Sequence, residues 1–271
     1  CGGTFDEHPT FAVCVDPLSQ PVTFQVEHGD GAVRVRTAAL VVTVGLDPFC
    51  LDVHRADGTP VVEGLRDDEG RCWSFATLND AFEVRRACTP GDPIWGLGEK
   101  TGRHNRRGRT FTLWNTDVLD PRASGEFAAT VAAGDPRADN TSTQFDPYYM
   151  SVPLFHHQAQ PGGPIGASFV DNGFRAHYDF TAPHEYRFGF TGGQYTEYVF
   201  AGPDLRSILA AYTWLTGRTP LPPMWALGFH QCRWFPYTQD ALEAIGRRHR
   251  ESGVPCDVLW LDIDHMDGYR V

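Results

Sequence analysis

The sequence has no run of about 18 consecutive apolar residues, the length that a helix needs to cross a lipid bilayer, so no membrane contact is predicted. It also has no Cys-x-x-Cys pair. Its seven cysteines form an odd number at irregular spacings, which favours neither a disulfide scaffold nor a zinc ribbon. We therefore expect reduced thiols in a cytoplasmic protein. The chain begins with Cys1 rather than Met and shows no signal-peptide pattern, as expected of a chain cut at both ends.

Basic residues are fewer than acidic ones. The 34 Asp and Glu outnumber the 23 Lys and Arg, which gives a formal net charge of −11. Nucleic acids and anionic membranes are themselves negative, so neither is an expected partner. The short basic cluster at residues 103–109 is too small for a nucleic-acid surface, and we expect it to form a solvated or ion-paired loop. The spacings of His and Cys match no zinc signature, so neither a metal nor a cofactor is predicted.

The first 202 residues read as a β-sandwich domain. The chain contains 28 Gly and 20 Pro, and short apolar stretches with β-branched and aromatic residues alternate with turn signals such as Asp57-Gly58. The clearest predicted strands are Val33–Arg36, Leu40–Val44, Ala81–Val84, Thr110–Trp114, Ile165–Val170 and Glu185–Phe190. The stretch from Asp120 to Tyr148 is too long for a hairpin turn and is predicted to be a functional or mobile loop.

After residue 202 the apolar residues change from the alternation typical of strands to helical spacing, which indicates a second domain. Residues 203–219 predict a helix that links the two domains, opened by Pro203-Asp204 and ended by Gly217. Residues 220–271 predict a strand at Trp225–His230, a helix at about Thr238–Ser252 and a strand at Asp257–Ile263. Such a unit is the start of a (β/α)8 barrel, and the chain ends before the barrel could close.

Acidic residues stand where the second barrel strand is expected to end. The period of two places Trp260, Asp262 and Asp264 on one face of that strand. Active sites of barrel enzymes lie at the C-terminal ends of the strands, so these carboxylates are placed to accept hydrogen bonds from a polyhydroxylated ligand. The alternative is that they only cap the next element. His230, which ends the first expected strand, is predicted to have a hydrogen-bonding or packing role.

Three segments carry a resemblance to a known family. They are Leu-Pro-Pro-Met-Trp-Ala-Leu-Gly-Phe-His-Gln-Cys-Arg-Trp (221–234), Pro-Cys-Asp-Val-Leu-Trp-Leu-Asp-Ile-Asp-His-Met-Asp-Gly (255–268), and the region from Gly96-Leu-Gly-Glu-Lys to Leu113-Trp-Asn-Thr-Asp117. Together they resemble the retaining α-glucosidases of glycoside hydrolase family 31. The resemblance implies a galactose-mutarotase-like β-sandwich followed by a (β/α)8 TIM barrel that is truncated here.

The resemblance also implies roles for four residues. The acid matching Asp262 hydrogen-bonds hydroxyls of the sugar that is cleaved off, and Ile263 packs beside it. Trp234 matches an aromatic wall of the site. Asp117 matches an acid on a sandwich loop that contacts the sugar on the leaving-group side. Carboxylates accept hydroxyl protons strongly, and flat rings cover the apolar faces of a pyranose, so these roles agree with the residue types.

The two carboxylates that perform retaining hydrolysis are absent from the matched segments. In the resembled family both are aspartates on later barrel strands, and no matching motif occurs before Val271. No catalytic residue is therefore assigned. The prediction is a fragment of an exo-acting α-glucosidase that is inactive by itself and whose partner is an oligosaccharide or glucoside. The alternatives are an α-xylosidase or α-glucosyltransferase of the same family, or a non-catalytic carbohydrate-binding protein.

Overall fold

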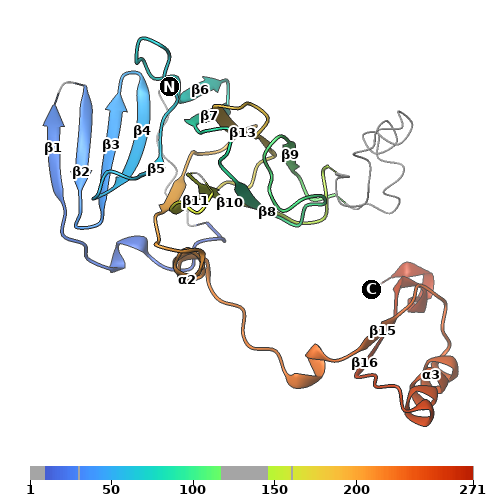
Figure 1. Ribbon diagram of the computed structural model, residues 1–271. Coiled ribbons are helices and arrows are strands. Elements are labelled where there is room, and N and C mark those ends of the chain that lie inside the picture. The colour runs from blue at the N-terminus through green and yellow to red at the C-terminus, as the bar shows by residue number, and fades with distance from the viewer. Residues whose placement is uncertain (1–9, 30, 117–145, 160, 271) are drawn as a thin grey trace. The chain divides into compact units, whose positions relative to one another are not determined.

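The computed structural model describes residues 10–29, 31–116, 146–159 and 161–270 (Figure 1). The chain divides into two compact units, Cys1–Gly217 and Arg218–Val271. The first unit is built almost entirely of antiparallel strands, and the second contains a pair of parallel strands with a helix between them in the chain. None of the helices among the described residues has the length and apolar character required to span a membrane.

The first sheet of the first unit has five antiparallel strands in chain order, β1 (Gln25–Gly29), β2 (Ala32–Arg36), β3 (Leu40–Leu46), β4 (Phe49–Arg55) and β5 (Pro60–Val62). A row of directly paired valines crosses it, formed by Val26, Val35, Val42, Val53 and Val62. Val53 and Val62 are buried, whereas Val26 is 45% exposed. The sheet is therefore anchored in the core through β4 and β5.

Two further sheets form the sandwich (Figure 1). One has the order β14-β11-β10-β8 and the other β6-β7-β13-β12-β9. Their strands are β6 (Phe75–Leu78), β7 (Ala81–Ala87), β8 (Ile94–Gly98), β9 (Thr110–Leu113), β10 (Ser151–Gln158), β11 (Ile165–Val170), β12 (Ala176–Asp179), β13 (Glu185–Phe190) and β14 (Glu197–Phe200). Alternate residues of β7 and β13 point into the core, where they meet side chains from the other sheet such as Ile94, Phe155 and Val170. The predicted sandwich is confirmed.

Helix α2 (Leu205–Thr216) completes the first unit. It begins at Asp204, whose side chain accepts a hydrogen bond from the backbone N–H of Ser207, and it ends at Gly217 with a φ of 89°. Its buried residues Ile208 and Leu215 pack in the same cluster as Phe169 of β11. The helix expected to link two domains is thus packed on the sandwich, and the division between the units follows it.

The second unit contains the parallel strands β15 (His230–Cys232) and β16 (Val258–Trp260), with α3 (Gln239–Ser252) between them in the chain. Short 3-10 turns are η3 (Met224–Leu227), η4 (Ile263–His265) and η5 (Asp267–Tyr269). The strand expected at Trp225–His230 is wrong in its bounds. After Pro223 the chain turns, with the N–H of Ala226 bonded to the carbonyl of Pro223, and strand pairing starts only at His230. The expected α3 is confirmed, capped by Thr238 and Gly253.

A disulfide joins Cys50 of β4 to Cys72, so the expectation that every thiol is reduced is wrong for this pair. The two cysteines are separated by 22 residues and meet next to Gly64, where an added Cβ would lie 2.6 Å from the Sγ of Cys50. The spacing of the two cysteines does not identify them as a pair, because only the fold brings β4 beside residue 72. Disulfides persist in oxidising compartments, so this one argues against the cytoplasmic location predicted above.

Candidate functional site

The two parallel strands of the second unit end at one edge, and the candidate residues follow directly. Cys232 is paired with Trp260 in the register of β15 and β16. Trp234 and Asp262 lie at the same offset beyond these two paired residues. Since the ends of parallel strands share an edge of the sheet, both candidates belong to the edge at which barrel enzymes place their sites.

One carboxylate oxygen of Asp262 accepts a hydrogen bond from the protein, and the other accepts none from the described residues. Its Oδ1 accepts a hydrogen bond from the N–H of Ile263 at 2.7 Å and so caps η4. Its carbonyl oxygen accepts from the N–H of His265 and lies 2.6 Å from the Nδ1 of the same residue. The half-buried carboxylate is therefore held at the start of the turn, while Oδ2 has no protein donor among the described residues. The capping role considered as an alternative is present, and it leaves one oxygen for a ligand.

The predicted alternation does not reach Asp262 and Asp264, because β16 pairs only as far as Trp260 and η4 begins at Ile263. Asp264 accepts a hydrogen bond from the hydroxyl of Tyr269 at 2.9 Å. This bond and the negative charge of Asp264 raise the pKa of Tyr269. Of the two strand-end acids, Asp264 is thus bonded to another side chain, whereas the carboxylate of Asp262 is bonded only to a backbone N–H among the described residues.

Exposed apolar side chains follow both strands. Trp234 is 70% exposed and Ile263 is 48% exposed. Arg233 lies over the ring of Phe235, 4.9 Å from its centroid, so the residues flanking Trp234 interact with each other. Exposed apolar side chains that follow the two strand ends offer a surface for a ligand or for more of the polypeptide.

A hydrogen bond between Trp260 and His230 links β16 to β15. The sequence alone does not predict this pair. The Nε1–H of Trp260 donates to Nδ1 of His230 at 3.0 Å. Indole nitrogen can only donate, so Nδ1 of His230 is the acceptor and the neutral ring carries its proton on Nε2. That Nε2 is buried and has no hydrogen-bond partner among the described residues. The hydrogen-bonding role expected for His230 is thus to accept the indole N–H of Trp260.

Asp117 lies outside the described residues, but the chain on both sides of it is placed. The N–H of Thr116 donates to the carbonyl of Tyr148 at 3.0 Å. The side-chain oxygen of Asn115 accepts from the N–H of Ser151 at 2.8 Å. The segments that lead into and out of 117–145 are therefore hydrogen-bonded to each other at their bases.

Half-buried charged groups reinforce this base. Lys100, the single lysine of the chain, donates from Nζ to the carbonyl of Thr112 at 3.0 Å and to the hydroxyl of Ser151 at 3.3 Å. Burial lowers the pKa of Lys100, and the nearby carboxylate of Asp146 partly opposes the shift. Asp146 itself accepts the N–H of Thr112 at 2.8 Å. These bonds connect three chain segments that are distant in the sequence.

Arg106 corrects the expectation of a solvated basic loop. Its side chain is buried, with the residue only 7% exposed, and donates to the carbonyls of Gly96 and Arg103 at 3.3 and 2.9 Å. Its guanidinium also lies 5.4 Å from the centre of the Phe111 ring. Burial lowers the pKa of Arg106, with the charge of Arg109 adding to the effect. Carbonyl groups, rather than solvent, satisfy this charge.

No group of three or more His, Cys, Asp and Glu side chains suited to a metal ion occurs within the described part of the chain. The arrangement at the ends of β15 and β16 instead offers a carboxylate oxygen and exposed indole and aliphatic surface. A β-sandwich joined to the first strands of a parallel barrel, with such a strand-end edge, defines the class of barrel-containing carbohydrate-active proteins.

Comparison with known proteins gives the family. Residues 2–179 match the glycosyl hydrolase 31 N-terminal galactose mutarotase-like domain, and residues 219–271 match the glycosyl hydrolases family 31 TIM-barrel domain. The chain belongs to glycosyl hydrolase family 31. The predicted fold class, a galactose-mutarotase-like sandwich followed by the start of a (β/α)8 barrel, is confirmed.

Relatives match along nearly the whole chain but extend far beyond it. Alpha-glucosidase 2 of Bacillus thermoamyloliquefaciens is 34% identical over 261 residues, which are 96% of this chain and 30% of the relative. Alpha-xylosidase 1 of Arabidopsis thaliana is 32% identical over 88% of this chain and 23% of its own length. A dextranase of Flavobacterium johnsoniae, solved with isomaltotriose, is 25% identical with a TM-score of 0.79 over 98% of this chain and 29% of its own. This chain therefore spans less than a third of each of these proteins.

Proposed function

We propose that the chain is the N-terminal part of an exo-acting α-glucosidase that removes terminal α-linked glucose from maltose and related oligosaccharides. The observation that carries the proposal is the 34% identity to Alpha-glucosidase 2 over nearly the whole chain, together with the open oxygen of Asp262 at the strand-end edge. The relative's length beyond the matched region supports the view that this chain is a fragment.

Within that proposal each candidate residue has a physical role. Oδ2 of Asp262 accepts hydrogen bonds from sugar hydroxyls, because Oδ1 is already occupied by the N–H of Ile263. Ile263 and the indole of Trp234 cover the apolar faces of the pyranose. Asp117 contacts the sugar on the leaving-group side, from a segment whose base is fixed by Asn115 and Thr116.

Retaining hydrolysis uses two carboxyl groups about 5 to 5.5 Å apart, one as nucleophile and one as acid and base. We place both on barrel strands beyond Val271, so that this chain alone binds sugar without cleaving it. The full protein then works by double displacement through a covalent glucosyl-enzyme, and the residues described here supply binding and orientation.

A second candidate function is an α-xylosidase. The 32% identity to Alpha-xylosidase 1 favours it, since this value is close to the identity with the α-glucosidase. The fold does not determine which sugar is cleaved. Transfer of glucose to another sugar in place of water uses the same covalent intermediate and is a third outcome of the experiment below.

The test is to read the coding sequence that follows Val271, express the whole product and follow its reaction with maltose and with an α-xyloside by proton NMR. The proposal expects glucose from maltose, released first as the α-anomer. A charge-assisted hydrogen bond contributes about 1.5 to 3 kcal/mol, so Asp262→Ala should lower kcat/KM roughly ten- to hundredfold. Asp267→Ala is the control, because that carboxylate is 96% exposed and, among the described residues, is paired only with Arg270. Release of xylose alone, or of the β-anomer, would refute the assignment.

A further inference from the structure

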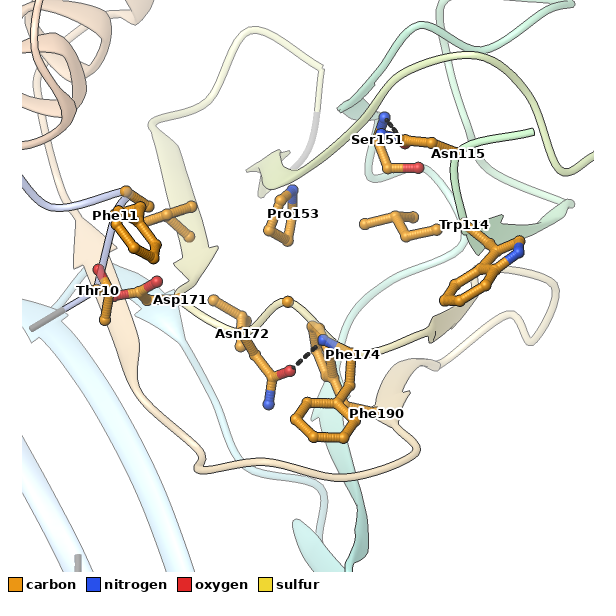
Figure 2. A pocket seen from close by; sticks show the side chains of 15 residues that line it. Thr10, Phe11, Trp114, Asn115, Ser151, Pro153, Asp171, Asn172, Phe174 and Phe190 are labelled. Atoms are coloured by element: carbon orange, nitrogen blue, oxygen red, sulfur yellow. Dashed lines mark hydrogen bonds between the residues drawn. The ribbon is translucent and has the colours of Figure 1, made fainter. Parts of the chain in front are cut away.

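A cavity of 670 Å³ opens in the first unit, at the end where β9 and β11 finish and β10 begins (Figure 2). Figure 2 shows Trp114 and Phe11 toward opposite ends of the cavity, with Phe174 and Phe190 along one side. Its lining combines aromatic rings with hydroxyl, amide and carboxylate groups. The residues used below are Trp114, Asn115, Asp171, Asn172 and Phe174.

The ring of Phe174 is a fixed platform. It lies against the backbone of a two-glycine turn, since a Cβ added to Gly192 or Gly193 would stand 2.9 or 2.8 Å from its ring carbons. The residue is nevertheless 55% exposed. The turn therefore supports the ring while much of the side chain remains uncovered. Trp114, also on the cavity, is 52% exposed, so the cavity offers two aromatic surfaces.

The loop that carries Phe174 is held rigidly before any ligand arrives. The amide nitrogen of Asn172 donates to the carbonyls of Gly192 and Gln194 at 3.0 and 3.1 Å. Its oxygen accepts the N–H of Phe174 at 2.8 Å, the bond drawn in Figure 2. A binding surface whose side chains are already ordered loses less conformational entropy when a ligand binds.

Two polar groups on the cavity have unused hydrogen-bonding capacity. The carboxylate of Asp171 lines the cavity and accepts no hydrogen bond from the described residues; its Oδ2 is buried, so Oδ1 is the oxygen that a ligand can reach. An accessible carboxylate oxygen that accepts no protein hydrogen bond can accept one from a hydroxyl group of a ligand. Asn115 accepts the N–H of Ser151 through its oxygen, and its amide nitrogen has no protein acceptor among the residues that the structure describes. The cavity thus presents an acceptor and a donor together with its aromatic surface.

We propose that this cavity binds a neutral pyranose sugar, as a carbohydrate site formed wholly by residues of the first unit. Rings that stack on the apolar face of a sugar, with a carboxylate and an amide for its hydroxyls, match that ligand class. The carboxylate of Asp171 and the net charge of −11 disfavour an anionic sugar. This inference goes beyond the proposed function, since Trp234, Asp262 and Ile263 do not line the cavity.

The experiment measures sugar binding by isothermal titration calorimetry on the 271-residue chain with Trp234→Ala and Asp262→Asn in place. These two substitutions remove the contacts proposed for the second unit, so failure of either proposal can be recognised separately. In this background methyl α-glucopyranoside and maltose should still bind, at millimolar concentrations. Absence of binding would overturn the cavity proposal and leave the proposed function untouched.

Variants of the cavity then locate the site. Phe174→Ala should weaken binding about tenfold, the loss of about 1.4 kcal/mol of ring contact. Asp171→Asn keeps the shape of the side chain and should weaken binding of the neutral sugars while improving that of glucuronate, a reversal that a purely structural role would not produce. Trp73→Ala is the matched control, an aromatic residue that is 61% exposed and lies off the cavity. Binding that is equally affected in all three variants, or unchanged by Phe174→Ala, would refute the proposal. Circular dichroism spectra check that each variant is folded.

Discussion

The ion pair between Arg86 and Glu197 is predicted to be essential to the stability of the sandwich. The two side chains are 1% and 3% exposed, and Nη2 of Arg86 lies 2.9 Å from Oε2 of Glu197. The same Nη2 donates to the hydroxyl of Tyr195 at 3.0 Å, and that hydroxyl donates to Glu197. Burial acts to lower the pKa of Arg86, but the charge of Glu197 overcomes this effect and the net pKa is raised. The pair is therefore charged, and each charge depends on the other.

Replacing Arg86 by Met leaves the carboxylate of Glu197 buried without its counter-charge. Breaking a buried pair in this way costs about 3 to 5 kcal/mol, because the remaining ion must stay desolvated or take up a proton. The double variant Arg86→Met with Glu197→Leu removes both charges, and replacing a whole buried pair by apolar residues is close to neutral in free energy. We therefore expect the double variant to be more stable than Arg86→Met alone.

The assay is urea unfolding followed by near-ultraviolet circular dichroism, which reports on the packing of the aromatic core. Arg85→Met is the matched control, because Arg85 directly precedes Arg86 in β7 and forms a pair with Glu83 in which both side chains are about a third exposed. An exposed pair of this kind contributes about 0 to 1 kcal/mol. If Arg86→Met costs no more than Arg85→Met, or if the double variant is no more stable than Arg86→Met alone, the reasoning is refuted.

Three further predictions concern the same unit. Replacing Cys50 and Cys72 by Ala should lower the free energy of unfolding by about 3 kcal/mol, because the bond joins residues 22 positions apart and restricts the unfolded chain. Thiol labelling of the unfolded wild-type chain with and without reductant should reveal the bond. If labelling is the same under both conditions, the disulfide does not form. Burial lowers the pKa of His157, so the unfolded chain binds its proton first as pH falls. Stability should be complete above the ordinary histidine pKa and decline as pH falls below it, and His157→Gln should flatten that decline in unfolding curves; an unchanged slope would contradict this. Gly96→Ala should cost about 3 kcal/mol, because its Cβ would lie 2.4 Å from the carbonyl of Leu154, and thermal unfolding with no shift would disprove the clash.

Elements bounded by clear chemical signals could be predicted closely from the sequence. Strands β11 and β13 have the predicted bounds, and both helices begin and end at the expected caps. The long strand β10 was not predicted. It contains Pro153 and a His156-His157 pair, and its register with β8 shifts between Ser151 and Phe155. A shifted register breaks the period of two on which a sequence-based prediction depends.

The sequence predicts which residues form the candidate site, which stays a prediction, but it does not predict the geometry around them. The period of a strand placed Trp260 and Asp262 near one edge, yet β16 ends at Trp260 and the carboxylate of Asp262 caps the following turn. The bond from Trp260 to His230 joins neighbouring strands whose residues are far apart in the chain. No local pattern contains such a contact, since it depends on the register of the two strands.

The charged residues around the base of the 117–145 segment can be understood from the cost of burying them. A buried ion without partners is strongly destabilising, and Lys100 and Arg106 meet that cost by donating to backbone carbonyls of several segments. Apolar side chains would stabilise a core equally well without setting the direction of any strand. Hydrogen bonds from a buried charged side chain do determine the direction of the strands, because each carbonyl must lie within bonding distance of a nitrogen of that side chain. We infer that these residues define where the chain enters and leaves the segment that carries Asp117, and that the Gly-Leu-Gly-Glu-Lys sequence contributes a scaffold for that segment.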